Sequence, residues 1–107
     1  MRLYTDGDFP AATARLRKIA DAQPGFTPAR FYLGICLLLT GERTSGIRQL
    51  REAAASASSY RESAHFYLAK TYLGEGDIAA ARQELNDLVA IHGELEKQAQ
   101  VLLTQIQ

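Results

Sequence analysis

The sequence has few of the features that disulfide-bonded, nucleic-acid-binding and membrane-spanning proteins need. One of its 107 residues is a cysteine, Cys36, so no internal disulfide can form. Twelve basic and twelve acidic side chains cancel, whereas a nucleic-acid-binding protein normally carries a clear positive excess. The longest apolar run, residues 33–39, is far shorter than the about 20 residues that cross a bilayer. We therefore expect neither a nucleic-acid partner nor direct membrane insertion.

Catalytic and metal-binding motifs are missing as well. The two histidines, His65 and His92, are 27 residues apart, and this spacing does not resemble a metal-binding motif. Residues 74–76 (Gly-Glu-Gly) lack the third glycine and the lysine of a phosphate-binding loop. Cys36 has no His, Lys or Arg within a helical turn, so we expect a buried hydrophobe and not a nucleophile. The sequence predicts no catalytic residue, no metal site and no cofactor, and hence no enzyme.

A three-residue turn recurs along the chain. The turn at residues 7–9 (Gly-Asp-Phe) returns at residues 41–43 (Gly-Glu-Arg) and at residues 76–78 (Gly-Asp-Ile), at spacings of 34 and 35 residues. Before the later two turns, residues 31–34 (Phe-Tyr-Leu-Gly) correspond to residues 66–69 (Phe-Tyr-Leu-Ala) at a shift of 35. Because aligned positions keep their size and polarity, we interpret the chain as internally repeated.

Within each copy the apolar residues follow a helical period. Each turn is followed by a small residue and, four positions later, by a leucine: Ala12 and Leu16, Gly46 and Leu50, Ala81 and Leu85. Helix starts are expected at Thr27-Pro28, at Asp77 and at Ser59, which forms a capping-box pattern with Glu62. Gly93 is expected to end a helix in a left-handed conformation. We predict an all-α chain of about six antiparallel helices, near residues 8–22, 28–39, 44–57, 60–74, 77–91 and 94–106.

These positions resemble the tetratricopeptide repeat family, whose unit is a helix–turn–helix with a period of 34 residues. Its signature appears here as Arg30-x2-Leu33-Gly34-x2-Leu37 followed by Gly46-x3-Leu50, and again as His65-x2-Leu68-Ala69-x2-Tyr72 followed by Ala81-x3-Leu85. The usual tryptophan position of the family is occupied by Arg30 and His65. The resemblance implies a single domain over residues 1–107, folded as a right-handed α-α superhelix. It would comprise a partial repeat (1–26), two repeats (27–59 and 60–93) and a C-terminal capping helix (94–107).

The two ends of this solenoid are expected to differ. The segment over residues 94–107 is apolar on one side and polar on the other, as in helices that end a solenoid. Residues 1–4 correspond to the end of a leading helix whose earlier part is not in the sequence. We therefore expect that the chain begins within a repeat, or that another chain covers this end and gives self-association.

The first helix of each repeat carries a second apolar stripe beside the one that packs. The stripe comprises Phe31, Ile35 and Leu38 in one repeat and Phe66, Lys70 and Leu73 in the next. In the resembled family this stripe lines a concave groove that holds a peptide or a helix, and apolar patches commonly mark interaction sites. The alternative is that these residues pack within the same stack or against polypeptide absent from this sequence. The chaperone-binding subfamily uses lysine and asparagine here, so Phe31 and Ile35 argue against that subtype.

Two functions are compatible with these patterns. The first is a protein–protein interaction module or scaffold that binds a peptide or helix of a partner protein in a largely apolar groove, with Lys70 offering one cationic contact. The alternative is a structural element that self-associates or docks within a larger parent protein. The cellular location is open. A cytoplasmic location is the default, because no charged segment followed by an apolar one opens the sequence.

Overall fold

The computed structural model describes residues 9–106, and this part of the chain contains six helices and no strand. The helices are α2 (Phe9–Ala22), α3 (Thr27–Leu39), α4 (Arg43–Ala55), α5 (Arg61–Gly74), α6 (Ile78–Ile91) and α7 (Glu96–Gln105). The all-α prediction is confirmed. Two boundaries differ from the expected ones by two residues, since α4 ends at Ala55 and α7 begins at Glu96, and the others differ by at most one residue. The expected end of a leading helix at residues 1–4 lies outside the described residues.

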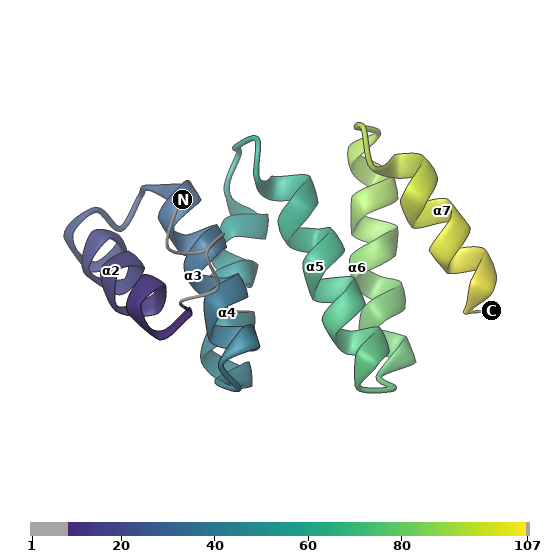
Figure 1. Ribbon diagram of the computed structural model, residues 1–107. Helices are drawn as coiled ribbons and strands as arrows, with labels where there is room; N and C mark the ends of the chain where they lie inside the picture. The colour runs from purple at the N-terminus through teal and green to yellow at the C-terminus, as the bar shows by residue number, and fades with distance from the viewer. Residues whose placement is uncertain (1–8, 107) are drawn as a thin grey trace.

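The helices are arranged in a row that follows their order in the chain. Each helix packs mainly on the one before it and the one after it, from α2 at one end to α7 at the other (Figure 1). The described part measures 39 × 27 × 22 Å along its principal axes. In such a stack a helix can bury its apolar face only against its neighbours.

The turns after α3 and after α5 have the same geometry. Gly41 and Gly76 have φ angles of +88° and +78°, a conformation that costs glycine little because it has no Cβ. In each turn the amide of the residue after the glycine donates to a carbonyl five positions earlier, at 2.8 Å in the first turn and 2.9 Å in the second. These bonds close the helix ends. The two glycine turns are therefore structural equivalents, 35 residues apart.

The caps at the starts of α5 and α6 differ from each other. Asp77 caps α6 as predicted, because its Oδ1 accepts a hydrogen bond from the Ala80 amide at 3.2 Å. The prediction of a capping box formed by Ser59 and Glu62 is wrong, since no side chain caps α5. Glu62 is used elsewhere: its Oε1 accepts a hydrogen bond from the amide of Leu95 at 3.1 Å. This contact ties the start of α5 to the start of α7.

The end of α6 also differs from the prediction. His92, and not Gly93, adopts the left-handed conformation, with φ 57° and ψ 41°. A Cβ on Gly93 would lie 2.3 Å from the carboxylate oxygens of Glu62. A larger residue at position 93 would therefore displace the Glu62 carboxylate, which lies directly over this backbone and accepts the hydrogen bond from the Leu95 amide.

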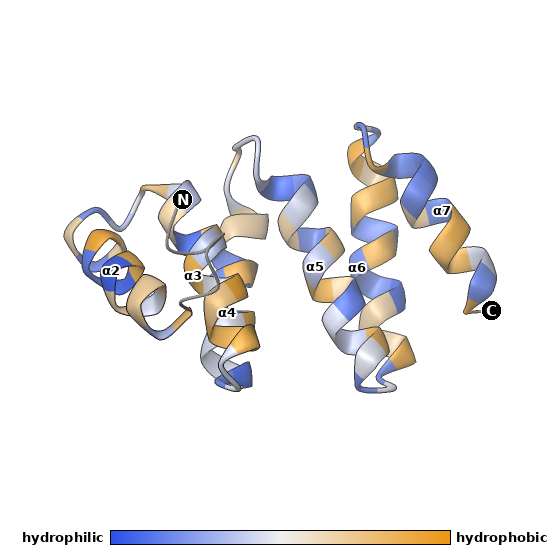
Figure 2. Ribbon diagram, in the orientation of Figure 1, coloured by the Kyte–Doolittle hydropathy of each residue, from blue (hydrophilic) through white to orange (hydrophobic). Residues whose placement is uncertain are grey.

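Three apolar clusters fill the interfaces along the row. One joins α2 to α3, the second runs from α3 across α4 and α5 to Ala81 of α6, and the third joins α5, α6 and α7. Leu16, Leu50 and Leu85, the leucines that follow the small residues, are at most 1% exposed. Figure 2 shows that α7 begins hydrophilic and carries an apolar band in its second half.

α3 and α4 pass close to each other at Gly34 and Gly46. A Cβ on Gly34 would lie 2.8 Å from Cγ of Leu50 and 3.1 Å from the carbonyl oxygen of Gly46. The equivalent positions in α5 and α6 are Ala69 and Ala81, both fully buried. Glycine at 34 and 46 lets the first pair approach within a distance that side chains would prevent.

One exposed ion pair links the two glycine turns. The Arg43 guanidinium, at the start of α4, donates two hydrogen bonds to the carboxylate of Glu75, which follows α5. These hydrogen bonds raise the pKa of Arg43 and lower the pKa of Glu75. The pair contributes little to stability, because both groups are exposed to solvent and salt.

Candidate functional site

The first half of the predicted stripe is covered by the chain itself. Phe31 and Ile35 are each 5% exposed. The ring of Phe31 lies against the rings of Tyr60 and Tyr67, with centroids 5.1 and 5.7 Å apart. The expectation that Phe31 and Ile35 face an open surface is wrong, because α5 and the residue before it cover them. For these two residues the alternative interpretation, packing within the stack, is the correct one.

Leu38, the third member of this half, is partly buried. It packs against the second apolar cluster, and its Cγ lies 2.9 Å from where a Cβ on Gly46 would be. Leu38 therefore fills the space that Gly46 leaves between α3 and α4.

The second half of the stripe is more open. Phe66 is partly buried, Lys70 is exposed, and Leu73 packs against the same cluster as Leu38. The Nζ of Lys70 lies 5.3 Å from the ring centroid of Phe66 and 5.3 Å from that of Tyr67. At this distance the ammonium group interacts favourably with the aromatic faces. Phe66 is thus bordered by a cation and is not closed over by aromatic rings as Phe31 is.

An apolar cavity adjoins Phe66 on the side of α7. We call it the Phe66 hollow; its lining residues are Phe66, Lys97, Gln98, Val101 and Leu102. It is a shallow depression, open to solvent, with a volume of about 340 Å³. Only apolar atoms line it, so Lys97 and Gln98 contribute their carbon stems and keep their polar ends in water. Val101 is 56% exposed.

The residues that lie next to Phe66 are smaller than the corresponding residues that cover Phe31. Tyr60 and Tyr67 cover Phe31. The residues 35 positions after these tyrosines are Leu95 and Leu102, which pack beside Phe66 against the third cluster. Replacing two aromatic rings with two leucines removes covering volume from this interface. The space appears as the Phe66 hollow.

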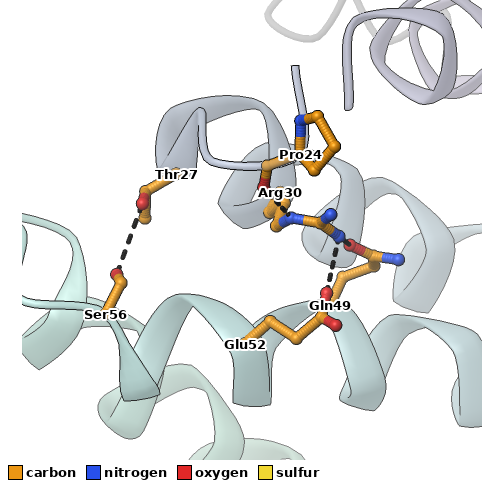
Figure 3. A network of polar contacts seen from close by, with 6 residues as sticks. All are labelled: Pro24, Thr27, Arg30, Gln49, Glu52 and Ser56. Atoms are coloured by element: carbon orange, nitrogen blue, oxygen red, sulfur yellow. Dashed lines mark hydrogen bonds and ion pairs between the residues drawn. The ribbon is translucent and has the colours of Figure 1, made fainter. Parts of the chain in front are cut away.

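A polar network, which we call the first corner, joins α3 to α4 (Figure 3). Arg30 Nε donates to the carbonyl oxygen of Pro24 at 2.6 Å, and its Nη1 donates to Gln49 Oε1 at 3.0 Å and to Glu52 Oε2 at 2.5 Å. One guanidinium therefore donates to three acceptors. Arg30 stands at the position that holds tryptophan in the resembled family, and here it links α3 to α4 through polar contacts.

The corresponding residues of α5 and α6 form the second corner. It consists of His65, Glu84 and Asp87, which lie 35 positions after Arg30, Gln49 and Glu52 respectively. His65 Nδ1 lies 2.9 Å from Glu84 Oε1, and one potential ligand atom from each of the three residues lies within 4.8 Å of the others. Side-chain exposure is 13% for His65 and 9% for Glu84. The sequence prediction of no metal site overlooked this grouping.

Cys36 does not contribute to a reactive site. It is fully buried, as predicted. Burial raises the pKa of its thiol, and a hydrogen bond with Thr13 opposes that effect only in part. The thiol is therefore held in its protonated, unreactive form at neutral pH.

No protein-family model, curated protein or solved structure matches the chain. Among the described helices, none is long and apolar enough to cross a bilayer. The two candidate sites both include residues of α5: Phe66 borders the Phe66 hollow and His65 belongs to the second corner.

Proposed function

We propose that the chain is a tetratricopeptide-type solenoid that acts as a protein–protein interaction module. Its binding surface is the Phe66 hollow, extended by Lys70 and Tyr67, whose ammonium group and ring lie next to each other beside Phe66. The observation that carries the proposal is a cavity lined by apolar atoms alone beside Val101, an apolar side chain that is 56% exposed. Such an arrangement commonly marks a contact surface. The role is one of binding, without a catalytic step or a cofactor.

The partner is a segment of another protein that presents an apolar side chain next to a carboxylate. The apolar side chain would enter the hollow between Phe66 and Val101. The ammonium groups of Lys97, which lines the hollow, and of Lys70, which lies over the Phe66 ring, would attract the carboxylate. An amphipathic helix meets both requirements, because it places residues four positions apart on one face. Within the predicted stripe, Phe31 lies against the ring of Tyr67 and is buried beside this surface, not part of it.

The test is a selection of peptides from a random library on the purified chain, followed by fluorescence-polarisation binding. Selected peptides are expected to share an apolar residue with an acidic neighbour. Val101→Glu places a charge at the mouth of the hollow and is expected to weaken binding at least tenfold. Leu39→Glu is the matched control, because Leu39 is 55% exposed but lies at the end of α3; this variant should bind as the wild type does.

Two results would contradict the proposal. One is the absence of enriched peptides, or binding that Val101→Glu leaves unchanged. The other is a concentration-dependent dimer that Val101→Glu dissolves, because the hollow would then be the contact between two copies. Light scattering of the wild type and of both variants measures this second result, and we expect a monomer throughout. The self-association expected at residues 1–4 lies outside the described residues.

A further inference from the structure

The two polar corners occupy equivalent places but differ in charge. In the first corner Arg30 supplies one positive charge to the carboxylate of Glu52 and to the neutral amide of Gln49, so the group is neutral. In the second corner the residues at the same positions are His65, Glu84 and Asp87. With a neutral histidine, this group carries two negative charges. The charges of the first corner therefore cancel, whereas the second corner lacks two positive charges.

The imbalance falls on a carboxylate that water hardly reaches. The Glu84 side chain is 9% exposed, and an ionised carboxylate at such a place requires a compensating charge. His65 reaches Oε1 of Glu84, while no hydrogen bond or ion pair within residues 9–106 joins His65 to Asp87. The Asp87 carboxylate accepts a hydrogen bond from Gln83 Nε2 at 3.0 Å. This contact orients Asp87 without neutralising it.

Two arginines lie near the second corner. Arg51 lines one small cavity with His65, Glu84 and Asp87, but its guanidinium donates to the hydroxyl of Tyr72 and lies 5.9 Å from the Tyr72 ring centroid. Arg61 lines a second cavity with His65 and Asp87. Within the described residues no ion pair joins either arginine to Glu84 or Asp87. The second corner therefore differs from the first in having no guanidinium between its acceptors.

We propose that His65, Glu84 and Asp87 bind a divalent transition-metal ion of the zinc type. One imidazole and two carboxylates form a ligand set suited to such an ion, and its two positive charges balance the corner. Ligand atoms at about 2.0–2.2 Å from one tetrahedral ion are about 3.4 Å apart. The separation of 2.9 Å between His65 Nδ1 and Glu84 Oε1 is near this value.

Binding requires two small adjustments. The ion takes the place of the proton between His65 and Glu84, so the neutral imidazole carries its proton on Nε2 and binds through Nδ1. The ligand atoms of the three residues lie within 4.8 Å of one another. The Asp87 carboxylate therefore moves inward only slightly to reach the distance between two ligands of one ion. The fourth position of the ion faces the adjoining cavity, which water can fill. Gln83 acts as an outer partner that orients Asp87.

The test uses the complete chain without a histidine tag. Zn²⁺ is titrated by calorimetry, and Co²⁺ is titrated by visible absorption, which reports tetrahedral coordination. We expect one equivalent of metal. His65→Gln should abolish binding, and Asp87→Asn, at a partly exposed position, should weaken it at least tenfold. His92→Gln is the matched control, because His92 faces Glu96 at 3.2 Å but has no third ligand grouped with it among the described residues.

A further variant separates metal binding from simple structural damage. His65→Arg recreates the first corner, so it should fold, as measured by circular dichroism, and should not bind metal. The proposal is overturned if the wild type binds neither ion at concentrations up to a millimolar. It is also overturned if His65→Gln and Asp87→Asn bind like the wild type, or if the His92→Gln control removes the binding. None of these outcomes depends on the peptide-binding proposal.

Discussion

The hairpin of α3 and α4 and the hairpin of α5 and α6 have the same turn but differ in what surrounds them. In the first, Phe31 is enclosed by aromatic rings and Arg30 joins its polar neighbours. In the second, Phe66 borders an apolar hollow and His65 reaches only one of two carboxylates. The same helix–turn–helix arrangement is thus covered by side chains in the first hairpin and left open in the second. We infer that the first hairpin serves stability and that binding is concentrated on the second.

The comparison also shows how open sites arise in a repeated fold. The glycine turns at Gly41 and Gly76 coincide in geometry, so neither opening arises from a change at these turns. Each opening follows from side chains that are too small to close it: leucines in place of Tyr60 and Tyr67, and a histidine in place of an arginine. A large side chain in one repeat therefore shows which volume or charge is absent at the corresponding position of the other repeat.

The largest expected effect comes from exchanging the small residues at the helix crossings. Gly34→Ala should lower the free energy of unfolding by about 1–3 kcal/mol, because its Cβ would press on Leu50 and on the Gly46 backbone. The opposite change, Ala69→Gly, should also destabilise, by about 1–2 kcal/mol, through lost helix propensity and a lost buried methyl group. Urea denaturation measures both. A stabilising Gly34→Ala would contradict this prediction, because it would mean that α3 and α4 are no closer together than α5 and α6.

A smaller effect is expected from exchanging the residues of the two corners. Arg30→His should lower the free energy of unfolding by about 1–2 kcal/mol, because imidazole cannot reach Pro24 and Glu52 together. His65→Arg should raise it by up to about 1 kcal/mol, since a guanidinium can reach both Glu84 and Asp87. Thermal unfolding of both variants in metal-free buffer is the measurement. A destabilised His65→Arg would mean that the two corners are not equivalent in space.

The smallest effect concerns the ion pair between the two glycine turns. The hydrogen bonds from Arg43 lower the pKa of Glu75 below its ordinary value of 4.5. The pair therefore stabilises the fold above pH 4.5, and this contribution is lost as the pH falls through the lowered pKa. Glu75→Gln should be slightly less stable than the wild type at pH 7, and the difference should disappear once the pH falls below the lowered pKa of Glu75. The difference should also shrink in 1 M salt, whereas a difference that persists at low pH would exclude the ion pair as its cause.

Much of the fold follows from local patterns in the sequence. The helices follow from the apolar period, and the turns follow from glycines at 41 and 76, because only local backbone geometry is involved. The cap at Asp77 and the buried Cys36 were predicted for the same reason. The position of the left-handed residue at His92 was not predicted, because the contact between Gly93 and the Glu62 carboxylate involves another helix.

The candidate sites could be predicted only in part. Helical spacing shows that Phe31 and Phe66 lie on matching faces, but it does not show which face another helix covers. The second corner escaped detection because His65 and Glu84 are 19 residues apart and lie on different helices. Comparing each residue with the one 35 positions earlier would have paired them with Arg30 and Gln49. In a repeated fold this internal comparison reveals contacts that motif spacing does not.

The most direct test of the proposed binding surface is a titration of the ¹⁵N-labelled chain with a selected peptide, followed through its amide chemical shifts. We predict that the largest shifts fall on Phe66, Val101 and Leu102, while the amide of Leu39 stays unchanged. Shifts centred on α3 and α4 would contradict it, since they would place the binding surface on the hairpin that the structure closes.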